Sequence, residues 1–209
     1  MSLLLFGVMI VNYALLAVLQ TRFVWMDENM WLACGFNVFM TAIAILFVKL
    51  RKQSLETIGL LKGRWKSSIA IGVILASVLF YNNCLSHVMA GSALVSTQKI
   101  VTLFVYYFFV SVCEEVVFRG YIGTRICGLV KKRWLAVCVT GLLFVVMHFP
   151  YRMIAYGMTL SDLTIHHLGW MADLFITHVV LQLIYLKTNS LYGAVIPHWM
   201  SNFANQIVM

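Results

Sequence analysis

The sequence predicts an all-α, polytopic membrane protein, a single transmembrane helical bundle of about seven spans with a cytoplasmic N-terminus. Of its 209 residues, 62% are hydrophobic, 11% are charged and two are prolines, whereas soluble domains have about 45–50% apolar and 25% charged residues. The 15 Lys and Arg and 7 Asp and Glu residues are too few to cover a soluble surface. The apolar residues also form runs of about 18 or more, which cross a bilayer core of about 30 Å.

Seven apolar segments are predicted to be the spans, and Gly, Pro and polar residues cluster in the short connections between them. The segments are residues 2–20, 30–48, 67–89, 99–122, 134–149, 168–186 and 191–208. The first lacks the basic start and the small-residue cleavage site of a signal peptide, so we predict that it is a span. No repeat or low-complexity linker divides the chain, so residues 1–209 are expected to form one membrane domain.

The basic residues are distributed unequally between the two ends of these spans. Alternating crossings place Lys49, Arg51, Lys52, Lys62, Arg64, Lys66, Arg125, Lys131, Lys132, Arg133 and Lys187 on one side, and Arg22, Lys99 and Arg152 on the other. Because Lys and Arg concentrate in cytoplasmic loops, the first side is predicted to be cytoplasmic, together with the N-terminus. Topology and contact with the lipid bilayer therefore explain the net charge of +8. Nucleic acid is not a predicted partner.

The five cysteines give no sign of a disulfide framework or of a cysteine zinc site. They are odd in number, form no CxxC pair and mostly lie within apolar segments. We therefore predict that Cys34, Cys84, Cys113, Cys127 and Cys138 are small packing residues.

Three charged residues lie inside the fourth segment, where a charge costs several kcal/mol and is usually paired and functional. They are Glu114, Glu115 and Arg119. Residues four apart share a helix face, so Glu115 and Arg119 can pair, whereas Glu114 points about 100° away. A carboxylate in apolar surroundings binds a proton more readily than in water, which suits a general base. The alternative is that all three form a buried charge network without chemistry.

Two further polar pairs occupy the fifth and seventh segments. Phe144 and His148 are one turn apart, and His198 and Asn202 share a helix face. Taken singly, His148 fits an interfacial residue, and the His198–Asn202 pair fits a polar contact between helices. Together with Glu114, they supply a base, a second group that handles protons, and donors for an oxyanion. These are the parts needed to add water to an amide.

The three motifs resemble those of the CAAX-protease and bacteriocin-processing family (CPBP, also called Abi) of intramembrane proteases. They are Glu114-Glu115-x-x-x-Arg119, Phe144-x-x-x-His148 and His198-x-x-x-Asn202, in this order on separate segments. Residues 56–60 with Trp65, and residues 190–194, also resemble segments of this family. The resemblance implies that residues 99–208 form the catalytic core and residues 1–98 the N-terminal spans.

The resemblance implies an endopeptidase that cleaves membrane-associated or lipidated proteins or peptides with water activated by a glutamate. Glu114 would activate the water with His148, while His198 and Asn202 would stabilise the oxyanion. Glu115, Arg119 and Phe144 would be supporting residues. The expected reactions are CAAX-type processing or bacteriocin maturation, and the expected location is a bacterial cell membrane. The alternative function within the same family is bacteriocin self-immunity or scaffolding without proteolysis.

Zinc is the cofactor that the resemblance leaves open. Glu114, His148 and His198 can ligate zinc and leave a position for water, or they can activate water directly. We expect no obligatory metal. The chain has no HExxH pair, and the adjacent His166 and His167 lie outside the motifs.

Two other polar residues, Asp173 and His178, lie in the sixth segment outside the motifs. We expect them to serve bundle packing, and a place beside the site or on the substrate path is the alternative. The sequence predicts neither an oligomeric state nor the inverted repeats and Gly- or Pro-broken helices of a transporter.

Overall fold

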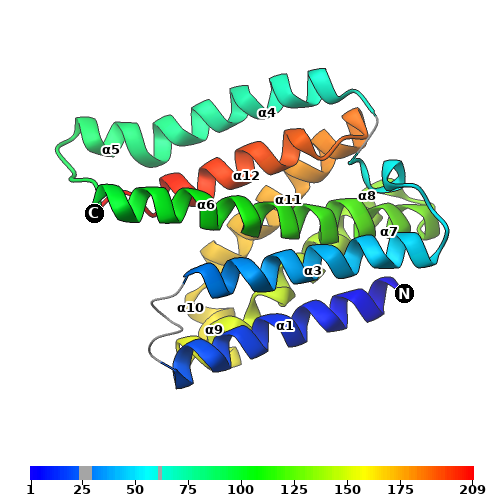
Figure 1. Cartoon of the computed structure of the whole chain (residues 1–209), viewed down its shortest axis with the longest axis horizontal. Helices are drawn as coiled ribbons and strands as arrows, with labels where there is room; N and C mark the ends of the chain where they lie inside the picture. The colour runs from blue at the N-terminus through cyan, green and yellow to red at the C-terminus, as the bar shows by residue number, and fades with distance from the viewer. Residues whose placement is uncertain (24–29, 61–62) are drawn as a thin grey trace.

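The computed structural model describes residues 1–23, 30–60 and 63–209, so Lys62 lies outside the described residues. Within these ranges the chain is helical, with a single isolated antiparallel bridge between Leu94 and Val208. Most of the long helices lie side by side as a bundle, and the helix Leu168–Thr188 crosses them at an angle (Figure 1). The prediction of an all-α membrane bundle is confirmed.

Six helical stretches of the described residues are long and apolar enough to cross a membrane. They are α1 (Ser2–Arg22), α3 (Met30–Leu50), α4–η2–α5 (Trp65–Phe80, Tyr81–Leu85, Ser86–Met89), α6–η3–α7 (Thr97–Glu114, Glu115–Gly123, Thr124–Leu129), α8–α9 (Arg133–Met147, Phe149–Ala155) and α11 (Leu168–Thr188). Shorter elements are η1 (Leu55–Ile58), α10 (Leu160–His166) and α12 (Tyr192–Ala204). Both η2 and η3 are π-helical.

The fourth and fifth spans extend beyond the boundaries predicted from the sequence. The fourth stretch has 33 residues, or about 50 Å of helix, because π-helical η3 leads past Ile122 directly into α7. A Cβ on Gly123 would lie 3.0 Å from Gln182 Oε1 of α11. Packing against α11 therefore favours glycine at this position, although a glycine in the sequence predicts the end of a helix. The fifth stretch continues past Pro150, which lies in the first turn of α9, where proline is tolerated.

The seventh predicted segment, residues 191–208, forms the 13-residue helix α12 and a non-helical tail. At about 20 Å this helix is shorter than the bilayer core. The tail instead pairs with the chain before α6, because Val95 N donates to Ile207 O at 3.0 Å and Met209 N donates to Ala93 O at 2.9 Å. α12 packs against both α4 and α6 (Figure 1).

Small residues allow α12 to lie close to α4. A Cβ on Gly193 would lie 2.7 Å from the Ser68 carbonyl oxygen, nearer than Cβ contacts occur in proteins. Gly193 N donates to Ser68 Oγ at 2.7 Å. Close approach of helices through small residues is typical of membrane bundles, and here it fixes the helix that carries His198.

The short helix η1 inserts between η3 and the start of α12. Ile58 is fully buried, and a Cβ on Gly120 of η3 would lie 2.9 Å from the carbonyl oxygen of Ile58. Leu191 N donates to Gly59 O at 3.1 Å. Residues 56–60 and 190–194, the two further segments that resemble the family, therefore meet at this contact.

The five cysteines are all free, and Cys34, Cys84 and Cys113 are buried. Each of the five lies within a helical element of the bundle. This arrangement agrees with the packing role that their sequence positions predict.

Candidate active site

Three helical stretches bring Glu114, His148 and His198 together. Glu114 ends α6, His148 lies between α8 and α9, and His198 lies in the middle of α12. His148 Nε2 is 4.0 Å from Glu114 Oε1, and His198 Nε2 is 3.6 Å from Glu114 Oε2. Glu114 and His198 are only 4% and 6% exposed. Side chains from different motifs therefore face one small space inside the bundle.

Glu115 points away from that space and contacts the side chains of Arg119 and His198. Its Oε1 lies 2.9 Å from Arg119 Nη1 and accepts a hydrogen bond from His198 Nδ1 at 2.6 Å. Glu115 and Arg119 are both fully buried. The predicted pairing of Glu115 with Arg119 is confirmed, and the same carboxylate also fixes the orientation of the His198 ring.

Phe144 packs among the charged side chains. The Arg119 guanidinium carbon lies 4.5 Å from the centre of its ring, a cation–π contact. The rings of His148 and His198 lie 5.0 and 6.3 Å from it. The Phe144 carbonyl oxygen accepts a hydrogen bond from His148 Nδ1 at 2.8 Å. Phe144 thereby supports the two histidines, and His148 directs Nε2 toward Glu114.

Tyr13 is a site residue that the sequence reasoning missed. Its hydroxyl donates to Glu114 Oε1 at 2.7 Å, across 101 residues of chain. The available signal was weak, because Asn12 and Tyr13 only briefly interrupt the apolar run of the first span. Helix α1 therefore supplies a direct partner of the carboxylate.

A cavity of about 360 Å³ opens beside Glu114. Its polar wall includes His148, Asn202 and Arg152, and its other walls are rich in aromatic side chains. The aromatic residues are Tyr13, Tyr106, Tyr107, Tyr151, Tyr156 and Trp170. The Arg152 guanidinium carbon lies 3.7 Å from the centre of the Trp170 ring. The four residues assigned to the chemistry thus lie at or next to one cavity.

A second cavity, of about 410 Å³, lies on another side of His198, between α4 and α11. Asp173 lines this cavity. The alternative that Asp173 lies on the substrate path therefore stays a prediction. His178 lies elsewhere, fully buried, with Nε2 3.0 Å from Thr140 Oγ1 and its ring 5.5 Å from that of Phe144. His178 therefore packs behind Phe144.

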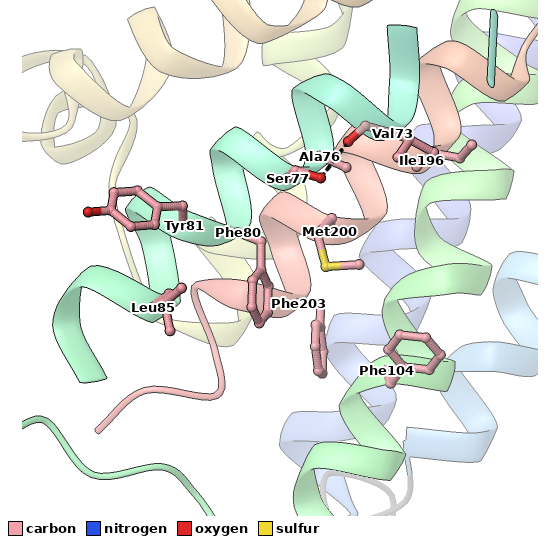
Figure 2. A pocket seen from close by; sticks show the side chains of 10 residues that line it. All are labelled: Val73, Ala76, Ser77, Phe80, Tyr81, Leu85, Phe104, Ile196, Met200 and Phe203. Atoms are coloured by element: carbon pink, nitrogen blue, oxygen red, sulfur yellow. Dashed lines mark hydrogen bonds between the residues drawn. The ribbon is translucent and has the colours of Figure 1, made fainter. Parts of the chain in front are cut away.

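Figure 2 shows a larger cavity, of about 660 Å³, where α4 faces α6 and α12. Apolar side chains line it, among them Phe80, Phe104 and Met200. Ser77 and Tyr81 contribute hydroxyl groups to its lining. Ser77 Oγ donates to the carbonyl oxygen of Val73 at 2.9 Å. This groove contains none of the acidic or histidine side chains and is separate from the site.

A family model described as type II CAAX prenyl endopeptidase Rce1-like matches residues 95–204, more than half of the chain. The chain belongs to this family. Neither the comparison with curated proteins nor that with solved structures found a match. Membership confirms the resemblance read from the motifs, and with six apolar helices it identifies an integral membrane protein of a protease family. The matched range contains Glu114, His148, His198 and Asn202, whereas Tyr13 lies outside it.

Zinc does not fit this site of the Rce1-like chain as the side chains lie. Two ligands of one tetrahedral zinc ion, bonded at about 2.0–2.1 Å, are about 3.3 Å apart, and the separations here are 3.6 and 4.0 Å. Among the residues that the structure describes, no group of three His, Cys, Asp or Glu side chains can hold a metal ion. Zinc use stays a prediction of the resemblance.

We predict that Tyr13→Phe lowers the kcat/KM of peptide cleavage about ten- to a hundredfold, because a hydrogen bond to a charged group contributes about 1.5–3 kcal/mol. Tyr192→Phe is the matched control, since its hydroxyl donates to Leu60 O at 3.0 Å on the protein surface. Cleavage rates and melting temperatures of both purified variants check this. Equal rates for Tyr13→Phe and the wild type would show that Tyr13 only fills space.

Proposed function

We propose that this chain is an intramembrane endopeptidase that hydrolyses peptide bonds of membrane-associated or lipidated substrates with water activated by Glu114. The observation that carries the proposal is the convergence of the Glu114 carboxylate with ring nitrogens of His148 and His198 within 4.0 Å. Glu114 and His148 line a cavity inside an apolar bundle, and His198 lies next to Glu114. A buried acid–base cluster beside a cavity is the usual arrangement of a catalytic site.

Glu114 and His148 are suited to hold and deprotonate a water molecule. His148 Nδ1–H donates to Phe144 O, so Nε2 carries the lone pair of the neutral ring. Nε2 and Glu114 Oε1 are then both acceptors, and a water donates one hydrogen to each. As the water oxygen bonds to the substrate carbonyl carbon, its proton passes to Glu114.

His198 and Asn202 are suited to stabilise the oxyanion that forms. Because His198 Nδ1–H donates to Glu115 Oε1, the ring donates from Nε2 only when both nitrogens carry protons. The buried Glu115 carboxylate balances the positive charge of that ring. The Asn202 amide, which lines the cavity, supplies a second donor.

The tetrahedral species collapses when the C–N bond breaks and the proton held by Glu114 passes to the leaving nitrogen. The products are a new C-terminal carboxyl group and a new amine, so one water is consumed for each bond cleaved. No bond forms between protein and substrate in this scheme.

We expect Glu114→Gln to lower kcat about a thousandfold, within the range that removal of a general base produces, without loss of folding. The full chain, purified in detergent, is given a farnesylated peptide that ends in a CAAX sequence and the same peptide without lipid. Mass spectrometry measures the fragments. Glu115→Gln is the comparison variant and should lower both activity and the melting temperature, because it leaves Arg119 buried without its partner, at a cost of about 3–5 kcal/mol.

Full cleavage by Glu114→Gln would contradict the proposed mechanism. Self-immunity or scaffolding without proteolysis predicts a different result, in which Glu114→Gln keeps its protective or partner-binding effect in cells. The two functions therefore separate on one variant.

Metal removal tests the expectation that no metal is obligatory. Dialysis of the purified protein against EDTA, followed by assay in metal-free buffer, should leave the cleavage rate within about twofold of the untreated protein. A loss of activity that added Zn²⁺ restores would show that the three side chains move together to hold zinc.

A further inference from the structure

We infer that the site opens on the extracytoplasmic face of the membrane, so that its substrates are peptide segments exposed on that face. The part of the inference that concerns substrates rests on the proposed function. The sidedness itself depends only on where the charges and the cavity lie, and can be tested without any cleavage assay.

One end of the bundle carries most of the basic side chains. At this end the chain leaves α3, enters α4, passes from α7 to α8 and leaves α11 (Figure 1). The described basic residues here are Lys49, Arg51, Lys52, Arg64, Lys66, Arg125, Lys131, Lys132, Arg133 and Lys187. Contacts join these segments, since Arg64 N donates to Thr188 O at 2.8 Å and Arg125 Nη2 donates to Gln53 Oε1 at 2.6 Å. By the positive-inside rule this end is cytoplasmic.

The other end has few basic residues. Among the described residues it carries Arg22 at the end of α1, Lys99 at the start of α6 and Arg152 in α9. The acidic Asp162, in the first turn of α10, also lies here. The difference in charge between the two ends is therefore large.

The cavity beside Glu114 extends toward this second end on each helix that lines it. On α6 the lining runs from Glu114 back toward Lys99 and includes Tyr106. On α1 it runs from Tyr13 to Leu16, in the direction of Arg22. On α12 it passes Asn202 and continues to Gln206 beyond the helix.

The rim of this cavity is accessible, whereas its opposite side is closed. Tyr156, which lines the cavity, is 63% exposed. In the other direction η3 is buried throughout, and Phe118, Tyr121 and Ile122 are fully buried. The second cavity, beside His198, also runs toward Asp173 and Asn205 at the same end. A peptide therefore reaches Glu114 from the end with few basic residues.

Substrate chemistry follows from this orientation. A protein that is anchored by a lipid in the cytoplasmic leaflet meets the basic end, where buried η3 lies between that end and Glu114. A secreted peptide, or a membrane-anchored segment exposed outside, meets the aromatic rim. The extracytoplasmic opening thus favours peptide maturation over processing of cytoplasmic lipidated proteins.

Cysteine labelling in intact bacterial cells tests the sidedness. Cys127 and Cys138, the two cysteines that are not buried, are replaced by alanine, and that parent sets the background. Tyr156→Cys reports the rim, and Leu129→Cys, at a position 81% exposed, reports the basic end. A membrane-impermeant charged maleimide should label Tyr156→Cys in intact cells and Leu129→Cys only after permeabilisation.

The reverse labelling pattern, or labelling of both reporters in intact cells, would overturn the inference. A second arm tests entry of the substrate in detergent, with a farnesylated CAAX peptide as the probe. A bulky maleimide on Tyr156→Cys should lower its cleavage at least tenfold relative to the unlabelled variant, and the same reagent on Leu129→Cys should not. Unchanged cleavage with a blocked rim overturns the inferred entry, whereas absence of cleavage in every unlabelled sample counts against the proposed function and leaves the labelling result standing.

Discussion

One buried oxygen, Oε1 of Glu115, joins the elements that form the site. It contacts the Arg119 guanidinium within η3 and the His198 ring of α12. Burial of charge in a bilayer protein is costly unless the charges are paired, so this contact links η3 to α12 at the site. It also leaves His198 Nε2 directed at Glu114. The orientation of the histidine that we propose to stabilise the oxyanion is thus a consequence of a structural ion pair.

Two adjacent carboxylates can serve different roles here because a helix points them in different directions. Glu115 faces Arg119 and His198, whereas Glu114 faces Tyr13 and the cavity. The proposed mechanism requires His198 with protons on both nitrogens, and the two carboxylates then balance one guanidinium and one imidazolium. A cluster without net charge is the least costly way to keep ionised groups away from water.

The features that follow from local spacing could be predicted from the sequence. The Glu115–Arg119 pair depends on an i, i+4 relation, and the motif residues match their family in order. The features that depend on tertiary packing could not. Tyr13 reaches Glu114 only because α1 lies against η3 and α8. Likewise, the continuation of the fourth span through η3 depends on neighbours that no local pattern reveals.

The origin of the oxygen atom in the product tests most directly the central claim, that Glu114 activates water and does not itself attack the peptide. Enzyme in excess over a cleavable peptide is mixed in H₂¹⁸O for a single turnover, and mass spectrometry reads the new C-terminal carboxyl group. Direct attack by water predicts one ¹⁸O atom in the product of this first turnover. A first product that carries only ¹⁶O, with ¹⁸O found in the Glu114 side chain, would show attack by the carboxylate through an anhydride and would contradict the mechanism.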